Sequence, residues 1–172
     1  MIEMLNKRRK DGEEGFTLIE LMVVVLIIGI LLAIAVPTFL SAQKNAKNKA
    51  ATSNVRSALS AVKTVYADKQ TYAVTRDDLI KAEPSLDWAA TSGATVVAAD
   101  SPQKIGWTAA AGTMTLVAKS KLNVCFWVKD DTATGTTYAR AAGTTCDTDD
   151  MPTAPDATTN TKFGTSADAW SE

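Results

Sequence analysis

Residues 15–37 read GFTLIELMVVVLIIGILLAIAVP, and this stretch decides the fold of the 172-residue chain. Its 21 residues from 16 to 36 contain a single charge, Glu20. A helix of that length spans about 31 Å, close to the roughly 30 Å of a bilayer's hydrocarbon core. We therefore expect a membrane-spanning helix. A carboxylate within such a helix is costly and indicates a function that requires a partner.

A short polar segment with the basic cluster at residues 7–10 precedes the apolar run. Because basic residues stay in the cytoplasm, we expect a single-pass chain with a cytoplasmic N-terminus. An ordinary secretory signal has a small-residue cleavage site after its apolar run, but no Ala-x-Ala site follows this run. Instead, Gly15 directly precedes it. A cut after Gly15 would create an amine at Phe16 that could pair with Glu20. The alternative is that Glu20 is a helix-start carboxylate favoured by the helix dipole.

The string from Gly15 to Glu20, with the apolar run after it, resembles the leader junction of type IV prepilins and type II secretion pseudopilins. The resemblance implies that a prepilin peptidase cuts between Gly15 and Phe16 and methylates the new Phe16 amine. It also implies that Glu20 neutralises the Phe16 amine of a neighbouring subunit during assembly. Gly29 and Pro37 then bound a segment that can lose helicity in a filament. The alternative for Pro37 is a kink where the helix leaves the membrane.

The helix is expected to continue to about residue 68 as an amphipathic segment. Apolar residues recur there at helical spacing: Val55, Ala58, Leu59, Val62, Val65 and Tyr66. This stripe needs one covered face, which predicts a globular domain packed on it. Thr75 followed by Asp78 is a capping signal and predicts a short helix over 76–82.

Five strand-like runs follow, at 95–99, 104–108, 113–118, 122–129 and 137–141. Their close spacing predicts an antiparallel sheet of three to five strands. Six of their residues are expected to face the helix stripe: Trp107, Leu116, Val117, Val124, Phe126 and Val128. The segment from Cys146 to the end is expected to be a long surface loop, pinned by Phe163 and Trp170.

These expectations add up to an α+β fold, a type IV pilin-like lollipop with a long N-terminal helix on a small antiparallel sheet. The predicted divisions are a leader at 1–15, a transmembrane and assembly half of the helix at 16–37, and its amphipathic half at 38–68. An extracytoplasmic globular domain occupies 69–172.

Cys125 and Cys146 both follow the membrane segment, on the part expected outside the cytoplasm. We expect one disulfide there, with two reduced buried thiols as the alternative. The pair also resembles the disulfide-bounded region of pilins, although 26 residues follow the second cysteine where pilins have a few.

The composition favours no enzyme, cofactor or metal site. The chain has no histidine, and no set of acid–base or nucleophilic residues stands out. Four carboxylates could offer oxygen ligands to calcium, but their spacing favours a solvated turn: Asp147, Asp149, Asp150 and Asp156. A net charge of −1 gives no basic excess for a dedicated nucleic-acid site.

We therefore predict a structural subunit of a type IV pilus, serving adhesion, motility or DNA uptake. Its expected partners are further copies in a filament, prepilin peptidase, a pilus or secretion assembly platform, and membrane lipid before assembly. The precursor is expected in the cytoplasmic membrane and the filament at the cell surface. One alternative is a pseudopilin of a type II secretion system, and another is an extracytoplasmic binding domain on an uncut signal anchor.

Overall fold

The computed structural model describes residues 15–89, 101, 103–143, 145–153, 162–164 and 170. The chain forms two compact units, one ending at Ala42 and the other running from Gln43 to Glu172. The strand expected at 95–99 and the carboxylate of Asp156 lie outside the described residues.

The long helix α2 spans Leu18–Lys69, 52 residues. In the second unit its apolar stripe faces the core, as the spacing predicts. Val55 and Ala58 are fully buried, and Leu59 and Tyr66 are partly buried against the same cluster. The helix ends where Gln70 adopts a left-handed φ of 54°, while the Gln70 N–H still donates to the Tyr66 carbonyl at 2.7 Å.

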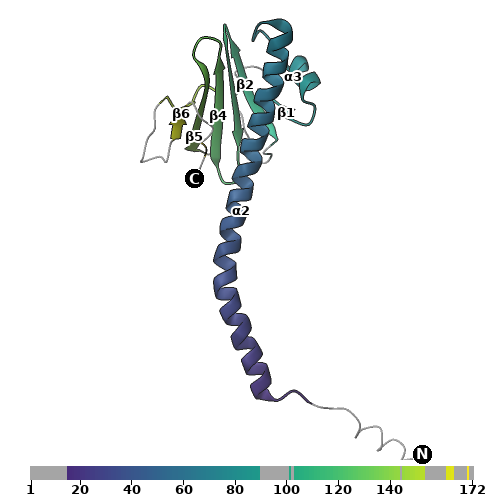
Figure 1. Cartoon of the computed structure of the whole chain (residues 1–172), viewed down its shortest axis with the longest axis vertical. Helices are drawn as coiled ribbons and strands as arrows, with labels where there is room; N and C mark the ends of the chain where they lie inside the picture. Colours follow the sequence, from purple (N-terminus) through teal and green to yellow (C-terminus); the bar gives the residue numbers. More distant parts are fainter. Residues whose placement is uncertain are drawn as a thin grey trace, which may run out of the picture. The chain divides into compact units, whose positions relative to one another are not determined.

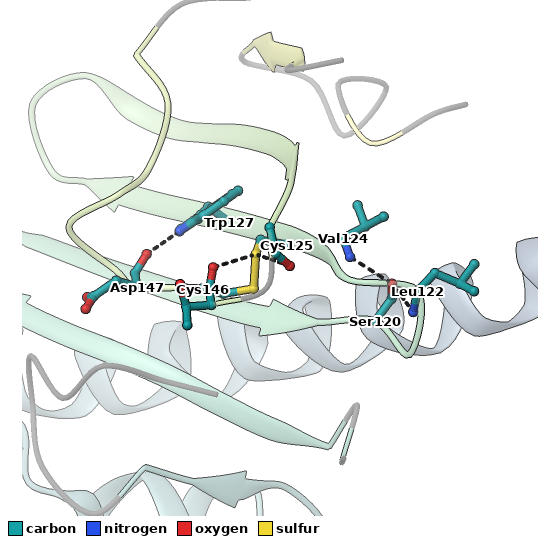
Figure 2. Close-up of a disulfide and its surroundings, with 9 residues drawn as sticks. Ser120, Leu122, Val124, Cys125, Trp127, Cys146 and Asp147 are labelled. Atoms are coloured by element: carbon teal, nitrogen blue, oxygen red, sulfur yellow. Dashed lines mark hydrogen bonds between the residues drawn. A yellow bond between two sulfur atoms is a disulfide. The ribbon is translucent and has the colours of Figure 1, made fainter. Parts of the chain in front are cut away.

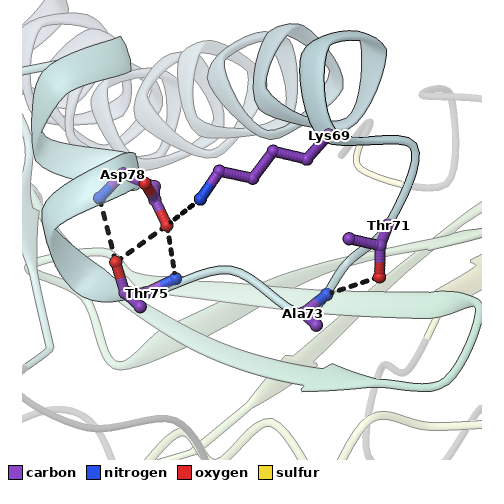
Figure 3. Close-up of polar contacts among 5 residues, drawn as sticks. All are labelled: Lys69, Thr71, Ala73, Thr75 and Asp78. Carbon is purple, nitrogen blue, oxygen red and sulfur yellow. Dashed lines mark hydrogen bonds and ion pairs between the residues drawn. The ribbon is translucent and has the colours of Figure 1, made fainter.

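The short helix α3, Arg76–Ala82, begins at the predicted cap. The Asp78 N–H donates to the Thr75 hydroxyl, and the Asp78 carboxylate accepts from the Thr75 N–H at 2.8 Å (Figure 3). Lys69, the last residue of α2, forms an ion pair with the same carboxylate at 2.6 Å. The hydrogen bond from Lys69, together with those from Thr75, holds the pKa of Asp78 well below its ordinary value. This carboxylate therefore joins the end of α2 to the start of α3.

In the described part of the chain, a six-stranded sheet follows the two helices, with its strands in chain order. All pairs are antiparallel except β1 with β2, which is parallel. The strands are β1 Asp87–Trp88, β2 Lys104–Ala110, β3 Thr113–Lys119, β4 Val124–Asp131, β5 Gly135–Ala142 and β6 Lys162–Gly164. The predicted α+β class with a long helix and a largely antiparallel sheet is confirmed (Figure 1).

The sheet has six strands where three to five were expected, and three details of it also differ from the prediction. Strand β4 begins at Val124 and not at Leu122, because a turn closed by the Ser120 N–H to the Val124 carbonyl (2.8 Å) occupies the preceding residues. Asn123 in that turn has a left-handed φ of 57°. The parallel strand β1 was not expected, and β6 lies in the tail that the composition assigned to a surface loop.

The sheet buries apolar residues on both faces. On the face toward α2, the predicted residues Trp107, Leu116, Phe126 and Val128 are buried in the main core, with Val124 partly buried beside them. Val117 was placed on that face wrongly: it belongs to a second cluster with Cys125 and Trp127. Successive residues of a strand point to opposite faces, so Leu116 and Val117 cannot share one. The second cluster lies on what we call the outer face.

Candidate assembly site

The start of α2 is fixed by a capping box that contains Glu20. Thr17 precedes the first helical residue, and its N–H and hydroxyl both donate to Glu20 Oε2, at 2.8 and 2.7 Å. In return, the Glu20 N–H donates to the Thr17 hydroxyl at 3.3 Å. Thr17 is a residue that the sequence reasoning missed, although Thr-x-x-Glu before an apolar run is the capping-box pattern.

This geometry places Glu20 in the first turn of α2, where the helix dipole favours a carboxylate. Both bonds that the carboxylate accepts from Thr17 end on Oε2. A carboxylate has about four acceptor positions on its two oxygens, so the cap leaves room for a further donor. Glu20 is exposed, and so are Gly15 and Phe16 before it, the latter at 84%. Capping the helix and binding an external amine are thus compatible roles for one carboxylate.

The first unit presents a helix that is apolar on every side. Every large apolar side chain from Phe16 to Leu40 is exposed by 48% or more. Among the described residues, α2 is the one helix long and apolar enough to cross a membrane. A helix that is hydrophobic all round requires an apolar environment, which lipid or other helices can provide.

Gly29 and Pro37 lie within this apolar surface without ending the helix. The helix runs unbroken through both residues. Pro37 lacks the N–H that a helix interior needs, and the Thr38 hydroxyl donates to the Ile34 carbonyl at 3.0 Å beside it. A methyl group at Gly29 would meet open space within the chain. Loss of helicity between the two residues remains a prediction about the filament.

The second unit contains a polar network around Asp130 that the sequence reasoning also missed. The Tyr72 hydroxyl donates to Asp130 Oδ2 at 2.6 Å, and Lys63 of α2 lies 3.4 Å from Oδ1. Thr136 of β5 donates to Oδ1 as well. Burial alone would raise the pKa of Asp130, but the hydrogen bonds from Thr136 and Tyr72 and the charge of Lys63 hold it below its ordinary value. The network joins α2, the following loop, β4 and β5.

The structure contains the predicted disulfide between Cys125 and Cys146 (Figure 2). Both residues are fully buried, and their Cα atoms are 5.6 Å apart. Next to the bridge, the Trp127 indole N–H donates to the Asp147 carbonyl at 2.5 Å. The disulfide therefore fixes the segment after β5 to the outer face of the sheet.

Within the described part of the chain, no group of three histidine, cysteine or acidic side chains is arranged to hold a metal ion. Asp147, Asp149 and Asp150 lie in the turn after the disulfide, where the Asp149 N–H donates to the Asp147 carboxylate at 3.3 Å. Asp149 and Asp150 are exposed.

Comparisons with known proteins match the chain to one family motif near its N-terminus and to two type IV pilins. The family described as the prokaryotic N-terminal methylation motif matches residues 10–36. The type IV major pilin protein PilA of Myxococcus xanthus is 48% identical over 65 residues, which are 38% of this chain and 30% of that relative. The type IV narrow pilus major component PilA5 of Thermus thermophilus is 37% identical over 105 residues, 60% of this chain and 85% of that relative. The chain thus spans less than a third of the Myxococcus protein and most of the Thermus protein. No solved structure matches the chain.

Proposed function

The chain belongs to the type IV pilin family, and from that premise we propose that it is a structural subunit of a type IV pilus filament. The observation that carries the proposal is the apolar surface of α2 between Phe16 and Leu40, which is exposed on all sides in a single chain. Lipid covers this surface in the membrane-bound precursor. Helices of neighbouring subunits cover it in the filament.

Processing at the N-terminus prepares the subunit for assembly in this proposal. Residues 1–15 are a leader on the cytoplasmic side, and prepilin peptidase cuts between Gly15 and Phe16 and methylates the Phe16 amine. Residues 16–37 then form the assembly half of the helix and 38–68 its amphipathic half, with the globular domain at 69–172 outside the cytoplasm. An assembly platform in the cytoplasmic membrane extracts the subunit.

Glu20 sets the register of the filament. Apolar helices slide past one another with little change in energy, because every position offers similar van der Waals contacts. A carboxylate in an apolar surrounding costs about 2.5–3.5 kcal/mol when unpaired, so one arrangement is preferred. In that arrangement the Phe16 amine of the next subunit binds the carboxylate that Thr17 already holds at its Oε2.

Glu20→Gln tests this proposal because it separates the charge from the cap. Glutamine also serves at the third position of a capping box, so the start of α2 stays formed. We expect processed subunit in the membrane at the wild-type level and a loss of sheared surface filament of about tenfold or more. Asp77→Asn is the matched control, since it removes one exposed carboxylate from α3 and should leave filament yield unchanged.

Normal filament yield from Glu20→Gln would show that Glu20 serves only as a cap, and it would contradict the pairing. Adhesion, motility and DNA uptake are the roles proposed for the filament. Each role is tested separately by measuring adhesion, motility and DNA uptake in a strain that lacks the gene and in the same strain with the gene restored.

A further inference from the structure

The outer face of the sheet carries a polar row next to its apolar cluster. Thr115 of β3, Lys129 of β4 and Thr137 of β5 are direct register partners across three neighbouring strands. Register partners project from the same side of a sheet. Their neighbours in sequence, Leu116 and Val128, belong to the core on the α2 side. The row therefore lies on the face turned away from α2.

A pocket of about 360 Å³ lies over this row, and we call it the threonine pocket. The polar row forms its floor, and the segment after the disulfide forms its wall, with Asp149, Met151 and Pro152. Thr134 and Thr153 add two more hydroxyls at its rim. The volume lies at the lower end of the range of small-molecule sites.

The wall of the threonine pocket is held in place by strong local bonds. Cys146 is bonded to Cys125 of β4, and the Asp147 carbonyl accepts from the Trp127 indole. The hydroxyl of the buried Thr148 contacts that of Thr108 on β2. Because the wall is joined to the sheet covalently and through two side chains, the pocket exists before any ligand binds.

The charges of the pocket disfavour an ion as its ligand. One basic side chain, Lys129, and one acidic side chain, Asp149, line the pocket, so its lining has no net charge to attract an anion or a cation. Asp131 further balances Lys129: its pKa is held below its ordinary value by the Ala133 and Thr134 N–H groups, and the charge of Lys129 contributes. The pocket therefore contains one positive and one negative side chain and has little net charge.

Its hydrogen-bonding groups fit a ligand that carries hydroxyls. Threonine hydroxyls can donate and accept, the lysine ammonium only donates, and the aspartate carboxylate only accepts. A sugar hydroxyl can satisfy all three kinds of group. The apolar atoms of Met151 and Pro152 can pack on the C–H groups of a sugar ring.

We propose that the threonine pocket binds a neutral saccharide of one or two rings, through Lys129, Asp149 and the floor threonines. This site is distinct from the helix surface proposed for assembly. Binding can therefore be measured on the unassembled chain, and its outcome is independent of whether filaments form.

The test is saturation-transfer-difference NMR on the full chain in micelles of a detergent without a sugar headgroup. The probes are glucose, galactose, N-acetylglucosamine, lactose and cellobiose, with inorganic phosphate and calcium chloride as ionic probes followed by chemical-shift titration. We expect at least one sugar to bind saturably in the millimolar range. We also expect both ions to leave the amide shifts of Lys129 and Asp149 unchanged.

Asp149→Asn should weaken sugar binding about tenfold, the usual effect of removing a charge-assisted hydrogen bond. Asp150→Asn is the matched control, since Asp150 is exposed in the same turn but does not line the pocket, and it should leave the Kd unchanged. Thr137→Val gives a second variant on the floor with the same expected direction.

Three results would overturn the proposal: no binding by any sugar of the panel, equal losses in Asp149→Asn and Asp150→Asn, or saturable binding of phosphate or calcium at Lys129 or Asp149. Far-UV and near-UV circular dichroism of each variant checks that the fold is retained. Asp149 makes a good test position because it is exposed, and the hydrogen bond to Asp147 comes from its backbone N–H.

Discussion

Trp170, near the end of the chain, is predicted to stabilise the second unit strongly. Its side chain is 6% exposed and meets Phe126 and Tyr138 edge-on, with ring centroids 6.1 and 4.9 Å away. The Arg56 guanidinium of α2 lies 5.4 Å from the Trp170 ring centre. The indole N–H donates to the carbonyls of Trp127 and Ala139 at 3.2 and 3.0 Å. One side chain thus joins α2, β4 and β5.

The expected cost of Trp170→Ala follows from these contacts. A buried aromatic side chain removes about 150–250 Å² from water, and at about 25 cal/mol per Å² this is worth about 4–6 kcal/mol. Trp→Ala changes in protein cores cost about 3–5 kcal/mol, and we expect a loss of unfolding free energy in that range. Trp170→Phe keeps an aromatic ring but loses the indole N–H donor. About 1 kcal/mol of the unfolding free energy that this variant loses should therefore come from hydrogen bonding.

The assay is urea unfolding of the full chain in detergent, followed by near-UV circular dichroism of the aromatic residues that remain. The free energies of wild type, Trp170→Phe and Trp170→Ala should fall in that order. A loss below about 1 kcal/mol for Trp170→Ala would refute the reasoning, because it would mean that the ring is not buried in solution.

Two further predictions concern the same unit. Because the folded pKa of Asp130 lies below its unfolded value, its contribution to stability is present above about pH 4 and is lost as the pH falls through the folded pKa. Asp130→Asn should therefore lower the free energy of unfolding at neutral pH and make it fall less steeply as the pH decreases. Urea titrations from pH 7 down to about pH 3 measure both effects. A variant whose unfolding free energy falls with pH as steeply as that of the wild type would contradict the prediction. Removal of the disulfide by the double change Cys125→Ser and Cys146→Ser should lower the free energy of unfolding by about 3 kcal/mol, because the two cysteines are 21 positions apart. Equal urea midpoints for the double variant and the oxidised wild type would contradict this.

The features that could be predicted from the sequence are those encoded locally. The stripe from Val55 to Tyr66 has a helical period, and Thr75 and Asp78 are three residues apart, so both patterns are readable without knowledge of the rest of the chain. The disulfide could be predicted because the chain has two cysteines and both follow the membrane segment. Glu20 stands out as the one charge in an apolar run.

The features that could not be predicted depend on contacts distant in sequence. Strand β6 forms in a tail rich in threonine, aspartate and alanine, where no strand period is visible, because β5 offers it an edge. Tyr72 and Asp130 are 58 residues apart, and no local sequence pattern around either residue predicts their hydrogen bond. Val117 is a different case: alternation along β3 already assigns it to the opposite face from Leu116, and applying that rule would have placed it correctly.

The central claim is that this chain is processed at Gly15 and assembles into surface filaments. Mass spectrometry of the mature N-terminus, in isolated membranes and in sheared surface material, tests it most directly. The account predicts an N-methylated Phe16 in the sheared fraction. The same methylated end found in membranes alone would contradict the filament and favour a pseudopilin, and a chain still beginning at Met1 would contradict the processing itself.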